Sequence, residues 1–277
     1  MSRERAEAFV PGHVTGFFSA HHHDNPLRAG SRGAGLTLSD CVHVTVEPAD
    51  ETTVTLNDQQ AEMAAVNHVL TELGVTCTVT ATTDLPISAG FGVSGATALG
   101  AALAANAVSD CHRSENALVG LAHAGEVTAG TGLGDVVAQA RGGVPVRLEP
   151  GAPGYGLLDG IPARARVEYI TFGSLSTADI ITGDTAQLTK AGERALAYLM
   201  EEPTLTRFMI ASRKFAREAD LLTPEVEEAI EAVRADGGQA AMAMLGQTVF
   251  ALGTGLSDAG YDAASCRIHP PGATLAE

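Results

Sequence analysis

The first half of the chain alternates between strand-like and helix-like patterns of apolar residues. Apolar and polar residues alternate over Leu36–Pro48, which predicts a half-buried strand, and Thr52–Asn57 is expected to be its hairpin partner. Apolar residues recur at helical spacing over Ala61–Leu73, and Gly74 follows where helices commonly end. The other elements expected in this half are a strand over Val75–Thr83, helices over Gly95–Val108 and Glu115–Thr128, and a strand over Val144–Leu148.

The second half is mainly helical in pattern. The segment Glu149–Ala163 is rich in proline and glycine, which is typical of a boundary or a loop between two lobes. The elements expected after it are a strand over Val167–Phe172, helices over Thr185–Met200, Thr204–Ala219, Pro224–Ala235 and Gln239–Leu245, an apolar segment Val249–Leu252 and a final strand over Ala264–Ile268. This order predicts an α+β fold with two lobes, residues 1–163 and 164–277.

Composition and charge limit the classes of molecule that the protein is expected to bind. The chain has 277 residues, a formal net charge of -16 and only two lysines, Lys190 and Lys214. An acidic surface opposes binding to nucleic acid or to anionic lipid. Any phosphate must therefore be held by backbone N–H groups, Mg²⁺ and a few arginines. The lack of lysine favours a protein from a high-salt cytoplasm, where charge repulsion is screened; an ordinary acidic protein from a GC-rich genome is the alternative.

Three features bear on location and cofactors. No apolar run is long enough to cross a bilayer, and the N-terminal sequence MSRERAEAFVPG lacks the apolar core of a signal peptide, so a cytoplasmic location is expected. The four cysteines form no CxxC pair, which favours reduced core cysteines over disulfides or a structural zinc site.

The most informative segment is 84–104, with the sequence DLPISAGFGVSGATALGAALA. An expected strand leads into a glycine-rich loop, which opens into a helix of small residues. Gly90 and Gly92 allow positive φ and close approach of a ligand, and Ser94 stands where an N-cap belongs. Such a helix start binds anions, most often phosphate. The loop fits neither the Walker A nor the dinucleotide fingerprint, and tight helix packing is the alternative.

This segment resembles the second signature of the GHMP kinases, the superfamily of galactokinase and of homoserine, mevalonate and phosphomevalonate kinases. The usual form is P-x-x-x-G-L-G-S-S-A-A; here Phe91 replaces leucine, Val93 replaces the first serine and Ser94 matches the second. In the family, that second serine helps to hold Mg²⁺. The residues that the resemblance assigns to ATP are Pro86, Gly90, Gly92, Val93, Ser94, Gly95 and Ala96.

Two more segments agree with this resemblance. PGHVTGFF, residues 11–18, is similar to the first GHMP signature, and residues 246–260 lie where the glycine-rich third signature belongs, although consecutive glycines are missing. The family implies an N-terminal ribosomal-S5-like lobe, here residues 1–163, that carries the ATP and catalytic motifs. It also implies a C-terminal ferredoxin-like lobe, here residues 164–277.

The resemblance assigns roles to two carboxylates. Glu126 lies near the end of an expected helix, where the family has a Mg²⁺ ligand, and Asp135 follows the loop GTGLG, where the family often has a catalytic base. A carboxylate and the Ser94 hydroxyl suit Mg²⁺, and a second carboxylate must accept or orient the attacking hydroxyl. The alternative is that Asp135 only caps a helix at Val136.

The segment 16–35 carries the candidate substrate residues. Arg28 and Arg32, with several glycines nearby, are placed for a carboxylate or a phosphate, because a guanidinium offers a bidentate fork. Three adjacent histidines cannot all face one metal, so we expect only one or two of them, His21 first, to be functional. Surface salt bridging is the alternative for the arginines. Gly132, beside Asp135, is also expected at the substrate.

The motifs PGHVTGFF, DNPLRAGSRGAGL and GTGLGDVVAQARGGVPVRLEPG together look like those of the archaeal pantoate kinases, a branch of the GHMP kinases. This resemblance implies an enzyme that uses ATP and Mg²⁺ to phosphorylate the 4-hydroxyl of pantoate in coenzyme A biosynthesis, and a haloarchaeal source agrees with the composition. A homodimer is left open. The alternatives are a kinase for homoserine, shikimate or mevalonate, and a non-catalytic nucleotide-binding relative.

Overall fold

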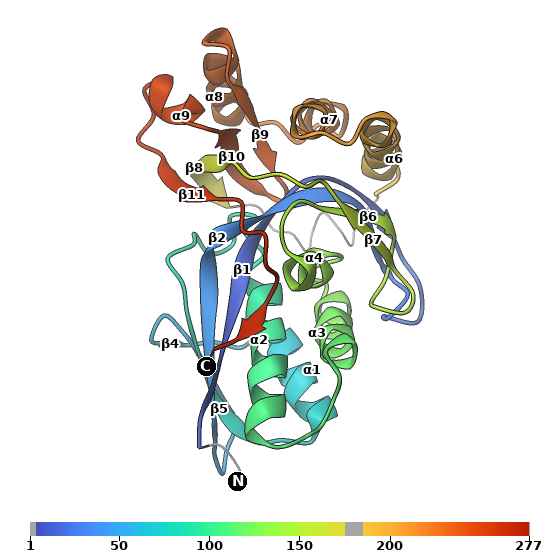
Figure 1. Cartoon of the computed structure of the whole chain (residues 1–277), viewed down its shortest axis with the longest axis vertical. Helices are drawn as coiled ribbons and strands as arrows, with labels where there is room; N and C mark the ends of the chain where they lie inside the picture. The colour runs from blue at the N-terminus through green and yellow to red at the C-terminus, as the bar shows by residue number, and fades with distance from the viewer. Residues whose placement is uncertain (1–3, 175–184, 277) are drawn as a thin grey trace.

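The computed structural model describes residues 4–174 and 185–276, which form two β-sheets covered by helices (Figure 1). Within these ranges, one sheet has eight strands in the order β12-β1-β2-β5-β3-β4, with β6 paired to β2 and β7 paired to β6. The other sheet has four strands in the order β11-β8-β10-β9. This confirms the expected α+β fold with two lobes. The exact division at residues 163 and 164 stays a prediction.

The element bounds are as follows. The strands are β1 Ala6–His21, β2 Gly30–Pro48, β3 Thr53–Leu56, β4 Gln59–Gln60, β5 Cys77–Thr82, β6 Pro145–Glu149, β7 Leu157–Gly160, β8 Arg166–Ser174, β9 Gln239–Ala243, β10 Gly246–Leu252, β11 Ala264–Arg267 and β12 Thr274–Leu275. The helices are α1 Ala64–Leu73, α2 Val93–Val108, α3 Glu115–Ala129, α4 Asp135–Arg141, α6 Ala186–Glu201, α7 Leu205–Glu218, α8 Pro224–Ala235 and α9 Gly255–Asp258.

The long antiparallel pair β1 and β2 connects the two lobes. The pair extends from the lower sheet in Figure 1 to the region beneath α6 and α7. Backbone bridges join Thr15 of β1 to Met244 and Leu38 of β2 to Ile268. Since β1 and β2 contact both sheets, side chains near the middle of β1 can meet residues from either lobe.

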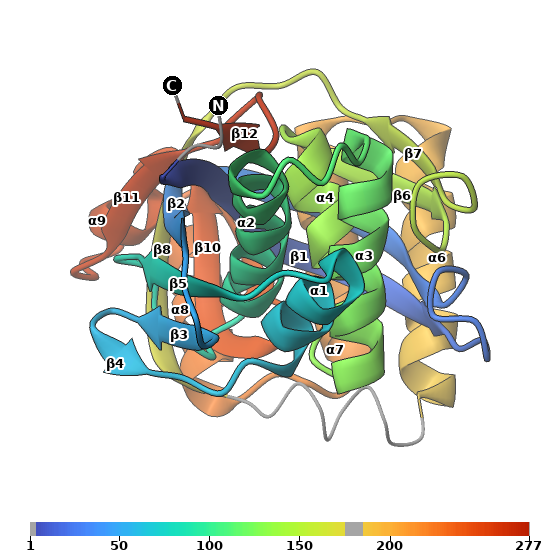
Figure 2. The same ribbon diagram turned by 90° about the horizontal axis from the view of Figure 1, so that it is seen from below.

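Helix α2 lies deep in the first lobe, between the sheet and its neighbouring helices. Helices α1, α2 and α3 lie side by side over one face of the sheet, with α4 beside them (Figure 2). Almost every residue of α2 is buried. A Cβ at Gly100 would clash with Val44 and approach Val10, so the small residues of α2 let it pack closely on β1 and β2.

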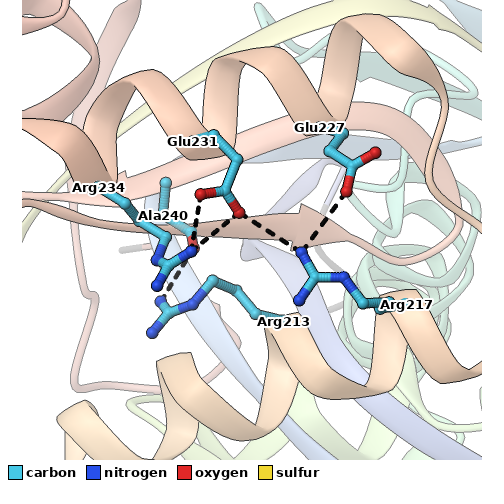
Figure 3. A network of polar contacts seen from close by, with 6 residues as sticks. All are labelled: Arg213, Arg217, Glu227, Glu231, Arg234 and Ala240. Atoms are coloured by element: carbon cyan, nitrogen blue, oxygen red, sulfur yellow. Dashed lines mark hydrogen bonds and ion pairs between the residues drawn. The ribbon is translucent and has the colours of Figure 1, made fainter.

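An ion-pair network on the second lobe joins α7 to α8 (Figure 3). Arg217 of α7 contacts Glu227 and Glu231 of α8 at 3.5 and 3.4 Å, and Arg234 contacts Glu231 at 2.7 Å. Arg213 donates to the carbonyl oxygen of Ala240 in β9. The four side chains that form ion pairs are largely exposed, so each pair stabilises the fold only slightly.

Two sequence expectations about elements are wrong. The segment expected as a hairpin partner of β2 is β3, which pairs in parallel with β5 instead. The segment expected as a helix over Gln239–Leu245 contains β9, an edge strand whose Ala240–Ala243 run is fully buried. A short, continuously apolar run has no period that separates a strand from a helix, so its pairing with β10 decides its conformation.

Other outcomes complete the comparison. The proline- and glycine-rich segment contains β7, which forms a hairpin with β6. The cysteines Cys77 and Cys266 are buried, whereas Cys41 and Cys111 are half-buried. Among the helices of the described ranges, none has the length and apolarity needed to cross a bilayer. The first three residues of the N-terminal segment considered for a signal peptide lie outside the described residues.

Candidate active site

The glycine-rich loop links β5 to α2 in the conformation that its glycines allow. Gly90 and Gly92 have φ of 89° and 65°, and Gly92 is the N-cap of α2. The expectation that Ser94 caps this helix is wrong, because α2 begins earlier, at Val93. The Ser94 side chain instead donates a 2.6 Å hydrogen bond to Oε1 of Glu126. The N-terminal N–H groups of α2 are therefore left for a ligand.

Both lobes hold this loop in place. Thr248 of β10 donates from its hydroxyl to the carbonyl oxygen of Ala89 at 2.8 Å. The backbone N–H of His13 in β1 donates to the carbonyl oxygen of Phe91 at 3.0 Å. The side-chain amide of Gln139 in α4 donates to the carbonyl oxygen of Gly92 at 2.9 Å. Hydrogen bonds from β10, β1 and α4 thus hold the loop in one conformation from three directions.

Glu126 lies in the last turn of α3 and is buried. Ser94 and Thr131 both donate to its Oε1, at 2.6 and 2.8 Å. Burial raises the pKa of Glu126 to about 7, although these two hydrogen bonds oppose the rise. A Cβ at Gly132 would lie only 2.5 Å from Oε2 of Glu126, so glycine keeps that oxygen accessible.

Asp135 is the first residue of α4, and its N-cap is Gly134. Its Oδ1 lies 2.7 Å from Nδ1 of the fully buried His13, while its side chain remains 24% exposed. Burial alone would raise the pKa of Asp135, but the hydrogen bond from His13 and the positive charge of Arg147 lower it overall. Asp135 is therefore an ionised carboxylate that a ligand can reach.

Arg147 is a fully buried cation on β6. Its Nε donates to the hydroxyl of Ser31 at 3.2 Å, and its Nη1 has no hydrogen-bond partner among the described residues. Burial lowers its pKa to about 10, so the guanidinium stays charged at neutral pH. A Cβ at Gly134 would lie 2.7 Å from Nε of Arg147, so Gly134 makes room for the guanidinium. A buried charge with an unpaired donor is costly unless a ligand completes it.

One cavity of about 530 Å³ brings these groups together. The expected residues that line it are Gly90, Gly92, Val93, Ser94, Glu126, Gly132 and Asp135. Its wall also contains Arg147 and Ser31, and a group of apolar side chains, Leu56, Met63 and Ile87. The cavity therefore joins an apolar region, a helix N-terminus, two carboxylates and a cation, and its volume suits a small-molecule ligand.

The other expected residues lie outside this lining, as far as the described residues show. Pro86 precedes the loop, and Gly95 and Ala96 are buried within α2. Nε2 of His21 lies 2.9 Å from the Ser19 hydroxyl. The guanidinium of Arg28 stacks on Tyr155 at 5.0 Å, and Nε of Arg32 donates to the carbonyl oxygen of Leu148 at 2.7 Å. Functional roles for all these residues stay predictions.

Sequence reasoning missed His13 and Arg147. His13 is part of the PGHV motif, and Arg147 is a charged residue inside an otherwise apolar expected strand. The second signal was available, because an arginine on a buried strand needs a partner or a function. Nothing local in the sequence indicates that His13 meets Asp135, which is 122 residues away.

Comparisons with known proteins agree with this architecture. The family described as GHMP kinases N terminal domain matches residues 61–143. Pantoate kinase of Thermococcus kodakarensis is 35% identical over 261 residues, which covers 88% of this chain and 86% of that relative. Pantoate kinase of Methanospirillum hungatei is 32% identical over 266 residues, which covers 91% of this chain and 89% of that relative.

Solved structures of similar fold include a phosphotransferase and a nucleotide complex. One, described as a phosphotransferase related to the CoA biosynthesis pathway, matches with a TM-score of 0.87 and 30% identity over 98% of both chains. Another, described as MDDEF in complex with MVAPP, AMPPCP and magnesium, matches with a TM-score of 0.76 and 18% identity over 99% of both chains, which shows the shared fold. The chain belongs to the GHMP kinase family. Within that family, three curated relatives at 32–35% identity are pantoate kinases.

Proposed function

We propose that this protein is a kinase that transfers the γ-phosphoryl group of ATP to the 4-hydroxyl of pantoate, a step of coenzyme A biosynthesis. The observation that carries the proposal is that the cavity of the glycine-rich loop contains both an ionised Asp135 and a buried Arg147 whose Nη1 has no hydrogen-bond partner among the described residues. Its relatives at 32–35% identity are pantoate kinases, which supports the same reaction.

ATP binding relies on the backbone rather than on lysine. The N–H groups at the start of α2 receive the phosphates, and the glycines of the loop let them approach. Leu56, Met63 and Ile87 form an apolar wall that suits the adenine ring; Ile87 is 50% exposed, so it has surface left to bury on binding. Val93 lacks the hydroxyl of the usual signature but keeps its backbone N–H at the first position of the helix.

The donor set near the loop fits Mg²⁺. The Ser94 hydroxyl, the Glu126 carboxylate and the Thr131 hydroxyl are hard oxygen donors gathered at one point. Within residues 4–174 and 185–276 there is no cluster of three or more His, Cys, Asp or Glu that would form a cage for a metal, and Mg²⁺ bound with a nucleotide needs few protein ligands. Ser94 and Glu126 would hold Mg²⁺, which supplies charge neutralisation of the phosphates when bound.

Pantoate fits the remaining groups. Its carboxylate pairs with Arg147, which satisfies the free Nη1, and its terminal hydroxyl faces Asp135 beside Gly132. The hydroxyl oxygen forms a bond to the γ-phosphorus as the bond to the bridging oxygen of ADP breaks. The hydroxyl proton passes to Asp135, and the leaving pair of electrons stays on ADP. We therefore assign the pantoate carboxylate to Arg147 rather than to Arg28 or Arg32.

Activation by Mg²⁺ is expected to depend on pH through Glu126. Its pKa of about 7 means that the carboxyl is increasingly protonated below neutral pH, and Mg²⁺ must displace that proton to bind. The Mg²⁺ concentration for half-maximal rate should rise about tenfold per pH unit below pH 7 and level off above it. Mg²⁺ titrations of initial rate at fixed ATP from pH 5.5 to 8.5 measure this. In the Glu126→Gln variant, the Mg²⁺ concentration for half-maximal rate should no longer depend on pH in this range.

A panel of acceptors tests the substrate against its rivals. Release of ADP, measured with a coupled assay, should be fastest with pantoate and much slower with homoserine, shikimate or mevalonate. Comparable rates with one of those acceptors would move the assignment to another GHMP activity. ATP binding without transfer to any acceptor would favour the non-catalytic relative.

We further propose that the protein comes from a salt-rich, haloarchaeal cytoplasm, because its net charge is strongly negative and it contains very little lysine. At a net charge of -16 with two lysines, folding brings like charges together, and salt screens their repulsion. The midpoint of thermal unfolding should therefore rise by several degrees between 0.1 and 2 M KCl. A midpoint that stays constant or falls contradicts this source. A homodimer remains a proposal that sedimentation in the same buffers would test.

A further inference from the structure

His13 is a buried histidine that contacts both parts of the candidate active site. Its backbone N–H donates to the carbonyl oxygen of Phe91 in the glycine-rich loop at 3.0 Å. Its Nδ1 lies 2.7 Å from Oδ1 of Asp135, and its side chain is fully buried. His13 therefore bonds to the glycine-rich loop through its backbone and to the Asp135 carboxylate through its side chain.

The imidazole of His13 fits only because the neighbouring residue on β2 is a glycine. Gly35 lies on β2, and a Cβ there would overlap Nε2 of His13. Nε2 has no hydrogen-bond partner within residues 4–174 and 185–276. A ring that only filled space would be better replaced by an apolar side chain, because a buried nitrogen without a partner destabilises the fold.

The surroundings of His13 select one protonation state. The charged or titratable groups that face the pair are Arg147 on β6 and Glu126 at the end of α3, besides Asp135 itself. Burial lowers the pKa of His13, and Arg147 lowers it further, although Asp135 opposes both effects. The ring is therefore neutral, and only the tautomer with hydrogen on Nδ1 can donate to the carboxylate.

We propose that His13 is a positioning residue: its Nδ1–H fixes Oδ1 of Asp135, while its backbone fixes the glycine-rich loop, so that one residue of β1 sets the base relative to the phosphoryl donor. This inference rests on the proposed kinase function. With Oδ1 held by His13, Oδ2 is the oxygen that lies toward Gly132 and receives the substrate proton. Side-chain variants of His13 test the Asp135 contact alone, because the backbone hydrogen bond to Phe91 remains.

Two variants separate the hydrogen bond from packing. His13→Asn keeps a donor at the position of Nδ1 but leaves a cavity, whereas His13→Leu fills the space without a donor. At saturating Mg²⁺ and ATP, His13→Leu should lower kcat roughly 10- to 100-fold with the KM for ATP unchanged, and His13→Asn should recover most of that loss. The acid limb of the kcat profile should also move to higher pH by about one unit in His13→Leu only, because Asp135 loses its donor.

Equal losses in both variants, or no loss in His13→Leu, would overturn the inference. A second measurement does not depend on the substrate. This measurement is the ¹⁵N spectrum of ligand-free protein labelled at its histidines, in which the His13 signals are those that disappear in His13→Asn. At neutral pH, these signals should show a protonated Nδ1 and an unprotonated Nε2. The opposite tautomer or an imidazolium would overturn the inference. If the wild-type protein fails to phosphorylate pantoate, the proposed function fails, and the spectrum still decides the contact.

Discussion

Replacing Asp135 by alanine is expected to lower kcat by roughly 10²- to 10⁴-fold, because the attacking hydroxyl loses the group that accepts its proton. Asp135 is the ionised carboxylate that the cavity exposes, and its Oδ2 lies toward Gly132. ATP binding should change little, since the N–H groups of α2, Ser94 and Glu126 are untouched. Initial rates with pantoate, together with the Kd for ATP from calorimetry, measure the two effects separately.

Asp262→Ala is the matched control for this prediction. Asp262 is also an aspartate, but it is exposed and lies outside the cavity. Its variant should have the kcat of the wild-type protein. An Asp135→Ala protein that keeps near-normal turnover while it remains folded would end the assignment of Asp135 as the base.

Replacing Arg147 by methionine should lower kcat/KM for pantoate by about 100-fold, mainly through KM. A charged hydrogen bond to a buried carboxylate contributes about 3 kcal/mol at most, and methionine of similar length removes the charge while it fills the space. The KM for ATP should stay close to the wild-type value. Steady-state kinetics with pantoate as the varied substrate provide the measurement, and the far-UV circular dichroism spectrum checks that the variant folds.

Arg28→Met and Arg32→Met are the matched comparisons. The Arg28 side chain is exposed and stacks on Tyr155, and Arg32 is held at the carbonyl oxygen of Leu148. Each variant should lower kcat/KM for pantoate less than fivefold, because neither residue lines the cavity. If Arg32→Met instead removes pantoate binding and Arg147→Met does not, the carboxylate subsite lies at the start of β2, within the segment 16–35 that the sequence alone suggested.

The sequence predicted the parts of the candidate site that depend on local patterns. The glycine-rich loop and its helix could be recognised because glycines that allow positive φ and a run of small residues both leave marks within a few positions. The N-cap was expected at Ser94 and lies instead at Gly92. Glu126 and Asp135 flank one short loop, so their proximity also followed from the chain. The hydrogen bond between Ser94 and Glu126 agrees with the motif that suggested this pair.

What the sequence could not predict depends on pairing between distant segments. Asp135 and His13 meet only because β1 passes beneath the loop before α2 and the start of α4. The parallel pairing of β3 with β5, and the strand conformation of β9, are likewise set by neighbours rather than by periodicity. The sequence pointed to Arg28 and Arg32 because glycines lie beside them. Arg147 reaches the cavity from β6, which pairs with β2, and no local pattern indicates that pairing.

The most direct test of the central claim is the phosphorus-31 spectrum of the product that forms from ATP, Mg²⁺ and pantoate. Phosphate on the 4-oxygen is bonded next to a methylene carbon, so its signal should be a triplet. With Asp135→Ala, this triplet should grow roughly 10²- to 10⁴-fold more slowly. A doublet would place the phosphate on the 2-oxygen, next to a carbon that carries one hydrogen. A doublet, or the appearance of inorganic phosphate without any phosphomonoester, would contradict the proposed function.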